Sequence, residues 1–175
     1  MKKYVFGLFI LGFVSLAYSQ DFTAKPGDND AKPDNFTKTM PNAEYLKIME
    51  RQDIPNLARS LEKIVASFDI KELEIYDSKD PSEYEVVFTD GNNTVIVSFD
   101  SYGSIIRSMG KFYDVRIPTK SSVTISKKYP GWEFRNTLCL IKYSKKKAVE
   151  IMYEVHLVNN KEKKIVKTDA LGNIL

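Results

Sequence analysis

The chain has 175 residues and a formal net charge of +3, with 26 Lys and Arg against 23 Asp and Glu. It contains one cysteine, Cys139, and one histidine, His156, which excludes an internal disulfide, a C-x-x-C site and a His-rich zinc site. Glycine-rich phosphate-binding loops are also missing from the sequence. We therefore expect neither a cofactor nor a metal.

The first nineteen residues have the order of an export signal. Lys2 and Lys3 precede an apolar run from Tyr4 to Ala17, and the small-residue pattern Ala17-Tyr18-Ser19 follows. The run has about 14 residues, whereas a membrane span needs about 20, which favours a cleaved signal over an anchor. We expect cleavage near Ser19 and a mature protein that is periplasmic or secreted, with no membrane anchor.

Residues 20–41 are rich in Asp, Asn, Lys, Thr and Pro and lack apolar periodicity, which predicts a disordered leader. Residues 42–175 are expected to form the folded domain. Charge is uneven along the chain: residues 21–106 carry 9 basic and 17 acidic side chains, and residues 107–175 carry 15 and 6. This separation could steer a charged partner, and it is also typical of solvated turns and sheet faces.

Two helices are predicted ahead of the first strand. A short one follows Pro41, and a second begins at Asp53-Ile54-Pro55, because aspartate can cap a helix and proline suits its first turn. The second helix has an apolar stripe that needs a sheet to lie on, opposite a charged face that includes Glu62. The stripe consists of Leu57, Leu61, Ile64, Val65 and Phe68.

The rest of the domain predicts an α+β fold in which helices cover one face of an antiparallel sheet. A third helix is expected near 120–129, although Ser, Thr and Val are weak helix formers. Apolar and polar residues alternate in the strand segments, which indicates one buried and one open face. Eight strands are predicted, near 72–77, 83–89, 94–100, 104–112, 132–135, 138–144, 148–158 and 163–168.

One segment occurs twice, 69 positions apart. Tyr84-Glu85-Val86 returns as Tyr153-Glu154-Val155, and the pattern Asp-x-x-Gly-x-Ile that starts at Asp100 returns at Asp169. Spacing held across two strands and two turns indicates two copies of one supersecondary unit with a shared core. We place repeat one at about 42–113 and repeat two at about 114–175.

This pattern of Tyr-x-Val strands and Asp-x-x-Gly turns resembles the PepSY-like, beta-lactamase-inhibitor-like secreted proteins of Bacteroidetes. Residues 111–118 look like the family's link between repeats, and Tyr129-Pro130-Gly131-Trp132 looks like the end of its second helix. The resemblance covers about residues 42–175. It implies a sheet of about eight strands with helices on one face, a periplasmic or secreted location, and a role in binding or inhibiting other proteins.

The sequence contains few candidate reactive groups. Cys139 lies between two leucines and is interpreted as a buried strand residue, and Asp100 and Asp169 as caps of their own turns rather than calcium ligands. The lysine clusters at 145–147 and 161–164 are interpreted as hairpin tips, since nucleic-acid binding would need interleaved aromatic residues.

We therefore interpret the chain as a non-catalytic module that binds a protein or peptide of the cell envelope on the open sheet face. Two alternatives stay open: a carboxylate-dependent hydrolase with a groove between the repeats, and a structural envelope scaffold. Tyr113 and Trp132 are candidate anchors, and each is also typical of core or rim packing. The open-face candidates are Val87, Ile96, Tyr143, Met152 and His156.

Overall fold

The computed structural model describes residues 3–5 and 40–175. The predicted export signal, apart from residues 3–5, and the predicted leader up to residue 39 lie outside the described residues. Three α-helices are described, α1 (Ala43–Glu50), α2 (Asn56–Ser67) and α3 (Thr119–Lys128), together with a 3-10 helix at Ile70–Glu72. The third helix therefore forms where the sequence predicts it.

The strands form one open sheet in which neighbours in sequence are neighbours in space. The six strands from β2 to β7 pair antiparallel, and β1 pairs parallel with β2. This confirms the α+β class and the antiparallel sheet. The strands are β1 (Lys3–Val5), β2 (Tyr84–Asp90), β3 (Asn93–Phe99), β4 (Ile105–Tyr113), β5 (Glu133–Ser144), β6 (Lys147–Asn159) and β7 (Glu162–Asp169).

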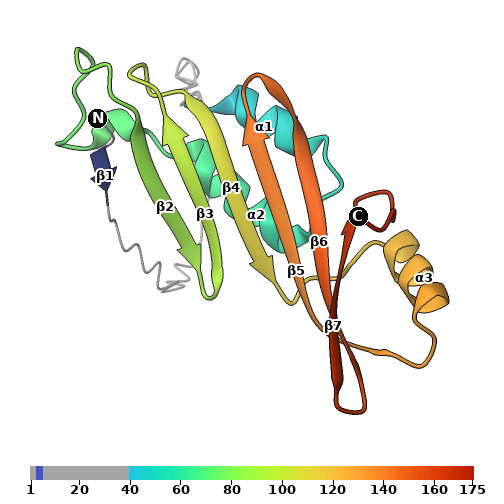
Figure 1. The fold of residues 1–175 in the computed structure, drawn as a ribbon. Helices are drawn as coiled ribbons and strands as arrows, with labels where there is room; N and C mark the ends of the chain where they lie inside the picture. The colour runs from blue at the N-terminus through green and yellow to red at the C-terminus, as the bar shows by residue number, and fades with distance from the viewer. Residues whose placement is uncertain (1–2, 6–39) are drawn as a thin grey trace, which may run out of the picture.

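Helices α1 and α2 lie behind the sheet, and α3 lies beside β7 (Figure 1). The main core is formed by alternate side chains of β2–β6 that face α1 and α2, including Tyr84 and Tyr153. A smaller cluster joins α3 to β6 and β7 through Ile125, Val155 and Val166. Apart from Ser98 of β3, burial of strand residues from β2 to β4 alternates, with the buried residues on the side of the sheet that the helices cover.

The described part of the chain has six antiparallel strands rather than the eight expected. The segment 72–77 is not a strand, because its backbone turns back on itself: the amide of Tyr76 donates to the carbonyl of Leu73 at 3.0 Å. The hydroxyl of Tyr76 then donates to the carbonyl of Ser101 at 2.7 Å, which fixes this loop over the β3–β4 turn. The segments 132–135 and 138–144 are one strand, β5, with a bulge between Phe134 and Asn136.

The buried face of α2 differs from the predicted stripe. Leu57 and Ile64 are each 37% exposed, and Glu62, expected on the polar face, is 1% exposed. Asp53 does not cap the helix, since Pro55 occupies the N-cap and no side chain bonds there. The helix is rotated relative to the predicted orientation. The small side chains of two alanines allow it to approach the sheet closely on a face that is less hydrophobic than the predicted stripe. That face consists of Ala58, Leu61, Glu62, Val65 and Ala66.

Glu62 belongs to a buried polar network between the helices and the sheet. The hydroxyl of Tyr45 on α1 donates to Oε2 of Glu62, and it lies 2.9 Å from Oγ of Ser108 on β4. The ring of Tyr143 on β5 stands edge-on to the Tyr45 ring, with centroids 4.9 Å apart. Oε1 of Glu62 has no hydrogen-bond partner among the described residues. Burial raises the pKa of the Glu62 carboxyl to about 7.

This raised pKa predicts a pH-dependent stability. Below pH 4.5 the Glu62 carboxyl is neutral in both states, and between pH 4.5 and about 7 it ionises first in the unfolded chain. The free energy of unfolding should fall over that window by about 1.4 kcal/mol for each pH unit. Urea denaturation of Glu62→Gln should lose this component, whereas Glu150→Gln, at an exposed position, should keep it. Equal pH profiles for wild type and Glu62→Gln would contradict the assignment.

The hairpins β2–β3 and β6–β7 have the same register 69 positions apart. Tyr84 pairs with Phe99 and Val86 with Val97; Tyr153 pairs with Thr168 and Val155 with Val166. Each hairpin ends in an aspartate whose Oδ1 accepts two backbone amides, from Tyr102 and Ser104 to Asp100 and from Leu171 and Asn173 to Asp169. Both aspartates therefore cap their own turns, as the sequence predicts.

Glycine is required in the second of these turns by its conformation and by its neighbours. Gly172 has φ +89°, and a Cβ there would lie 2.8 Å from the carbonyl carbon of Lys120 at the start of α3. Gly91, in the β2–β3 hairpin, has φ +56° and open space around it. Both positions have a positive φ, and only Gly172 is also closely packed.

We expect Gly172→Ala to destabilise the fold by about 2–4 kcal/mol and Gly91→Ala by about 1 kcal/mol. Both variants place a Cβ at positive φ, and only the first also forces α3 away from β7. Thermal or urea unfolding of the two variants measures the difference. Equal losses would show that α3 does not pack tightly on this turn.

Candidate binding face of the sheet

The face of the sheet turned away from α1 and α2 is termed the open face. Its side chains form rows across the strands, because paired residues in antiparallel strands point the same way. One row runs from Val87 through Ile96 and Met109 to Lys142 and Glu150. It is apolar over β2–β4 and charged over β5 and β6.

A second row places Lys111, Leu140 and Met152 side by side on β4, β5 and β6. Next to it, Glu154 pairs with Lys167, whose Nζ lies 2.9 Å from Oε1 of Glu154. The open face therefore alternates apolar side chains with charges of both signs. This mixture is typical of protein contact surfaces, in which an apolar centre is bordered by polar groups.

Two shallow grooves follow these rows. One, of about 430 Å³, lies over β2–β6 and contains Ile96, Met109 and the charged side chains of Glu85, Arg107 and Lys142. The other, of about 490 Å³, lies at the edge of β6 beyond the end of β7. Lys142 and Glu150 line both grooves, so that the two are continuous.

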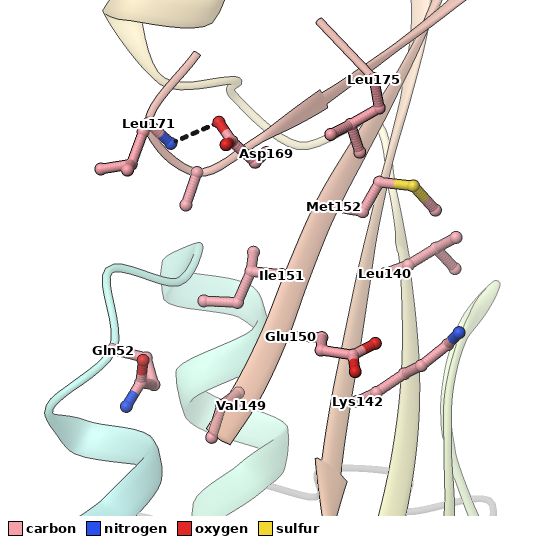
Figure 2. A pocket seen from close by; sticks show the side chains of 11 residues that line it. Gln52, Leu140, Lys142, Val149, Glu150, Ile151, Met152, Asp169, Leu171 and Leu175 are labelled. Atoms are coloured by element: carbon pink, nitrogen blue, oxygen red, sulfur yellow. Dashed lines mark hydrogen bonds between the residues drawn. The ribbon is translucent and has the colours of Figure 1, made fainter. Parts of the chain in front are cut away.

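Figure 2 shows how the second groove bends around β6. Met152, Glu150 and Lys142 lie on one side of the strand, and Val149 and Ile151 on the other. At its upper end stand two strongly exposed leucines, Leu171 at 69% and Leu175 at 70%. Exposed leucines next to a groove add apolar area that a partner could cover.

Four of the predicted open-face residues lie where the sequence places them. Val87, Ile96, Met152 and His156 all occupy positions of their strands that alternate with buried residues. His156 is exposed between Asn136 and Ile165, the latter 54% exposed. The two halves of the face are thus brought into one surface by the sheet order.

Tyr143 is not on the open face. Its side chain is 6% exposed and packs edge-on against Tyr45 in the main core. The buried residues of β5 are Cys139, Ile141 and Tyr143, which follow one another in steps of two, so that a count from Cys139 would have placed Tyr143 inward. The prediction for Tyr143 is therefore wrong.

The two candidate anchors lie in different places. Tyr113, at the end of β4, points to the open face beside Leu138 and is 43% exposed. Trp132 packs instead in the smaller cluster at the end of α3, with its ring centroid 6.3 Å from that of Tyr129. Nζ of Lys164 lies 5.6 Å from the Trp132 ring, so that this tryptophan is rim packing.

Sequence reasoning missed Met109, Leu138 and Leu140, which complete the apolar part of the open face. Met109 could have been found by counting back in twos from buried Phe112, which puts Gly110 and Ser108 inward and Met109 outward. The count gives a weak signal because glycine and serine are not recognisable as core residues.

Titratable groups near the grooves are engaged in structure. The carboxylate of Asp169 accepts bonds from two backbone amides and from Nδ2 of Asn173, which lower its pKa. Cys139 is fully buried, and burial raises the pKa of its thiol to about 12. Within residues 40–175, no cluster of three His, Cys, Asp or Glu side chains is arranged to hold a metal ion.

No helix in the described part of the chain combines the length and apolar character that crossing a membrane requires. A comparison with protein-family models finds no match. A comparison with curated proteins also finds no similar sequence.

Truncation of a side chain should affect stability strongly on the buried face of the sheet and weakly on the open face. Tyr143→Ala should lower the free energy of unfolding by about 3–5 kcal/mol, as for a buried aromatic side chain. Met152→Ala and His156→Ala, on the open face, should change it by about 1 kcal/mol or less. Urea denaturation of the three variants tests the assignment, and a large loss for His156→Ala would contradict it.

Proposed function

We propose that this chain is a non-catalytic binding module that holds a protein or peptide partner on the open face. The observation that carries the proposal is the one-sided cover of the sheet. All three described helices pack on the same side, and the other side carries a continuous row of apolar and charged side chains over two joined grooves.

The surface chemistry favours a polypeptide over other ligands. Both grooves are shallow and the first runs across neighbouring strands, which suits an extended or broad partner better than a small molecule enclosed on all sides. Charges of both signs border the apolar row, as in Glu154–Lys167, and such a pattern favours a partner with complementary charges of both signs. Nucleic acid would instead favour a surface of one sign.

Binding is preferred to hydrolysis for a structural reason. A carboxylate-dependent hydrolase needs two carboxyl groups that converge within about 10 Å in a pocket. In the groove at the edge of β6 these would be Glu150 and Asp169, and the carboxylate of Asp169 already serves its own turn. Glu62, the buried carboxyl with the raised pKa, faces Tyr45 and Ser108 rather than a groove.

We further propose that the fold is a duplication of one unit and that the chain is a relative of the PepSY-like, beta-lactamase-inhibitor-like secreted proteins, working in the periplasm or outside the cell. The shared register of the two hairpins and their matching turns support the duplication. The bridge from Thr168 to Ile174 also matches the pairing of Phe99 with Ile105, 69 positions earlier. Inhibition of another envelope protein would be one use of the open face.

Capture from an envelope extract tests the binding face. Immobilised protein should retain one or more polypeptides, and Ile96→Glu and Met152→Glu should each reduce that retention at least fivefold, because a charge would enter the apolar row. Val123→Glu is the matched control: Val123 is 47% exposed on α3, away from the open face. Retention that is equal across all three variants would remove the open face as the binding site.

A further inference from the structure

The outer edge of β2 is a second place where this sheet can accept a partner. Its only described neighbour on that side is β1, three residues long, which pairs with Tyr84, Glu85 and Val86. The edge from Val87 to Asp90 carries no strand among the described residues. Unpaired N–H and C=O groups along an edge strand are a template for adding another strand.

The hairpin register shows which backbone groups face outward. Asp90 and Asn93 close a two-residue loop and therefore form a hydrogen-bonded pair. Because such pairs alternate with non-bonded ones, the N–H and C=O groups of Glu85, Val87 and Thr89 point away from β3. Three outward donors in alternating positions define an edge site for an extended chain.

The hairpin β6–β7 has the same register as β2–β3, and its first strand, β6, already has a neighbour on the side that is open in β2. Glu154 and His156 of β6, which lie 69 positions after Glu85 and Val87, pair with Leu138 and Asn136 of β5. That neighbour is antiparallel and has twelve residues, whereas β1 has three. The second hairpin therefore shows that this backbone geometry accepts a long antiparallel strand.

The segment that leads into β2 and β2 itself are acidic. Residues 69–90 carry eight Asp or Glu and two Lys side chains, a net charge of −6. Glu85 lies on the edge strand itself, half-buried, and Asp90 is exposed at its end. β2 and β7 lie at opposite sides of the sheet (Figure 1), and β7 carries three lysines and two acidic side chains rather than this acidic excess. A basic occupant is favoured at β2 over an acidic one.

We propose that the outer edge of β2 binds an extended basic peptide segment of a partner protein by antiparallel strand addition. Partner residues opposite Val86 and Phe88 point to the helix side and are apolar, and those opposite Glu85 and Val87 are Lys or Arg. The site uses backbone groups of β2, adjoins the open face at Val87, and does not depend on binding to that face.

The test uses a labelled peptide, acetyl-Lys-Val-Lys-Val-Lys-Val-Lys-amide, with the glutamate peptide acetyl-Glu-Val-Glu-Val-Glu-Val-Glu-amide as control. Fluorescence anisotropy measures binding to the full chain and to a chain that starts at Gln20, the expected mature protein. We expect tighter binding to the shorter chain, because β1 covers part of the same edge. The lysine peptide should bind at least tenfold more tightly than the glutamate peptide.

Amide hydrogen exchange locates the peptide. Binding should slow exchange at Glu85, Val87 and Thr89, whose N–H groups face outward. Val87→Pro removes one outward donor at an edge position that tolerates proline, and it should weaken binding at least tenfold. Val87→Thr keeps the N–H and should stay within about twofold of wild type. If Val87→Pro does not fold, a peptide methylated on its edge-facing amide nitrogens gives the same loss from the ligand side.

Several results would overturn the proposal. They are equal binding of the two peptides, protection at amides other than these three, and unchanged affinity for both Val87→Pro and the methylated peptide. Protection of the same three amides that grows with protein concentration in the absence of peptide would assign the edge to a second copy of this chain. Loss of capture by Ile96→Glu with intact peptide binding would separate the open face from the edge.

Discussion

The packing of α1 and α2 against alternate side chains of β2–β6 is the constraint on which the rest of this molecule depends. It buries one face of the sheet, and a sheet with one buried face must leave the other to solvent or to a partner. The Tyr45–Glu62–Ser108 network lies inside this packing and joins α1, α2 and β4. The open face, its grooves and the direction of every strand residue follow from which side the helices occupy.

The buried carboxyl of Glu62 adds a cost to this arrangement, because a charged group is disfavoured away from water. A helix that buried only apolar residues would avoid this cost. Glu62 instead provides a partner for the Tyr45 hydroxyl, which would otherwise be buried next to Ser108 alone. The network therefore specifies how α1 and α2 sit on the sheet, and it makes the stability of the fold depend on pH near neutrality.

The β2 edge and the open face differ in the groups that they present to a partner. The face presents side chains, so that selectivity in the proposed binding there would come from apolar rows and paired charges such as Glu154–Lys167. The β2 edge presents backbone groups, which are the same in every peptide, and its selectivity comes from the acidic residues around it. A partner that used both would have a folded surface for the face and an extended basic segment for the edge. β5 fills the place beside β6 that a partner strand would fill beside β2.

Alternation of two in the sequence determined most of the sheet: the strands from β2 to β7, the buried Tyr84 and Tyr153, the self-capped aspartate turns and the outward Val87, Ile96, Met152 and His156. Only the tertiary structure decided the rotation of α2 that buries Glu62, the bulge that joins the segments 132–135 and 138–144 into β5, and the loop at 72–77. The physical reason is the same in each case. Local periodicity in the sequence reflects only the hydropathy of the residues. Bulges, small residues such as Ala58 and Gly110, and hydrogen bonds between distant segments also decide which side chains are buried, and they leave the hydropathy pattern unchanged.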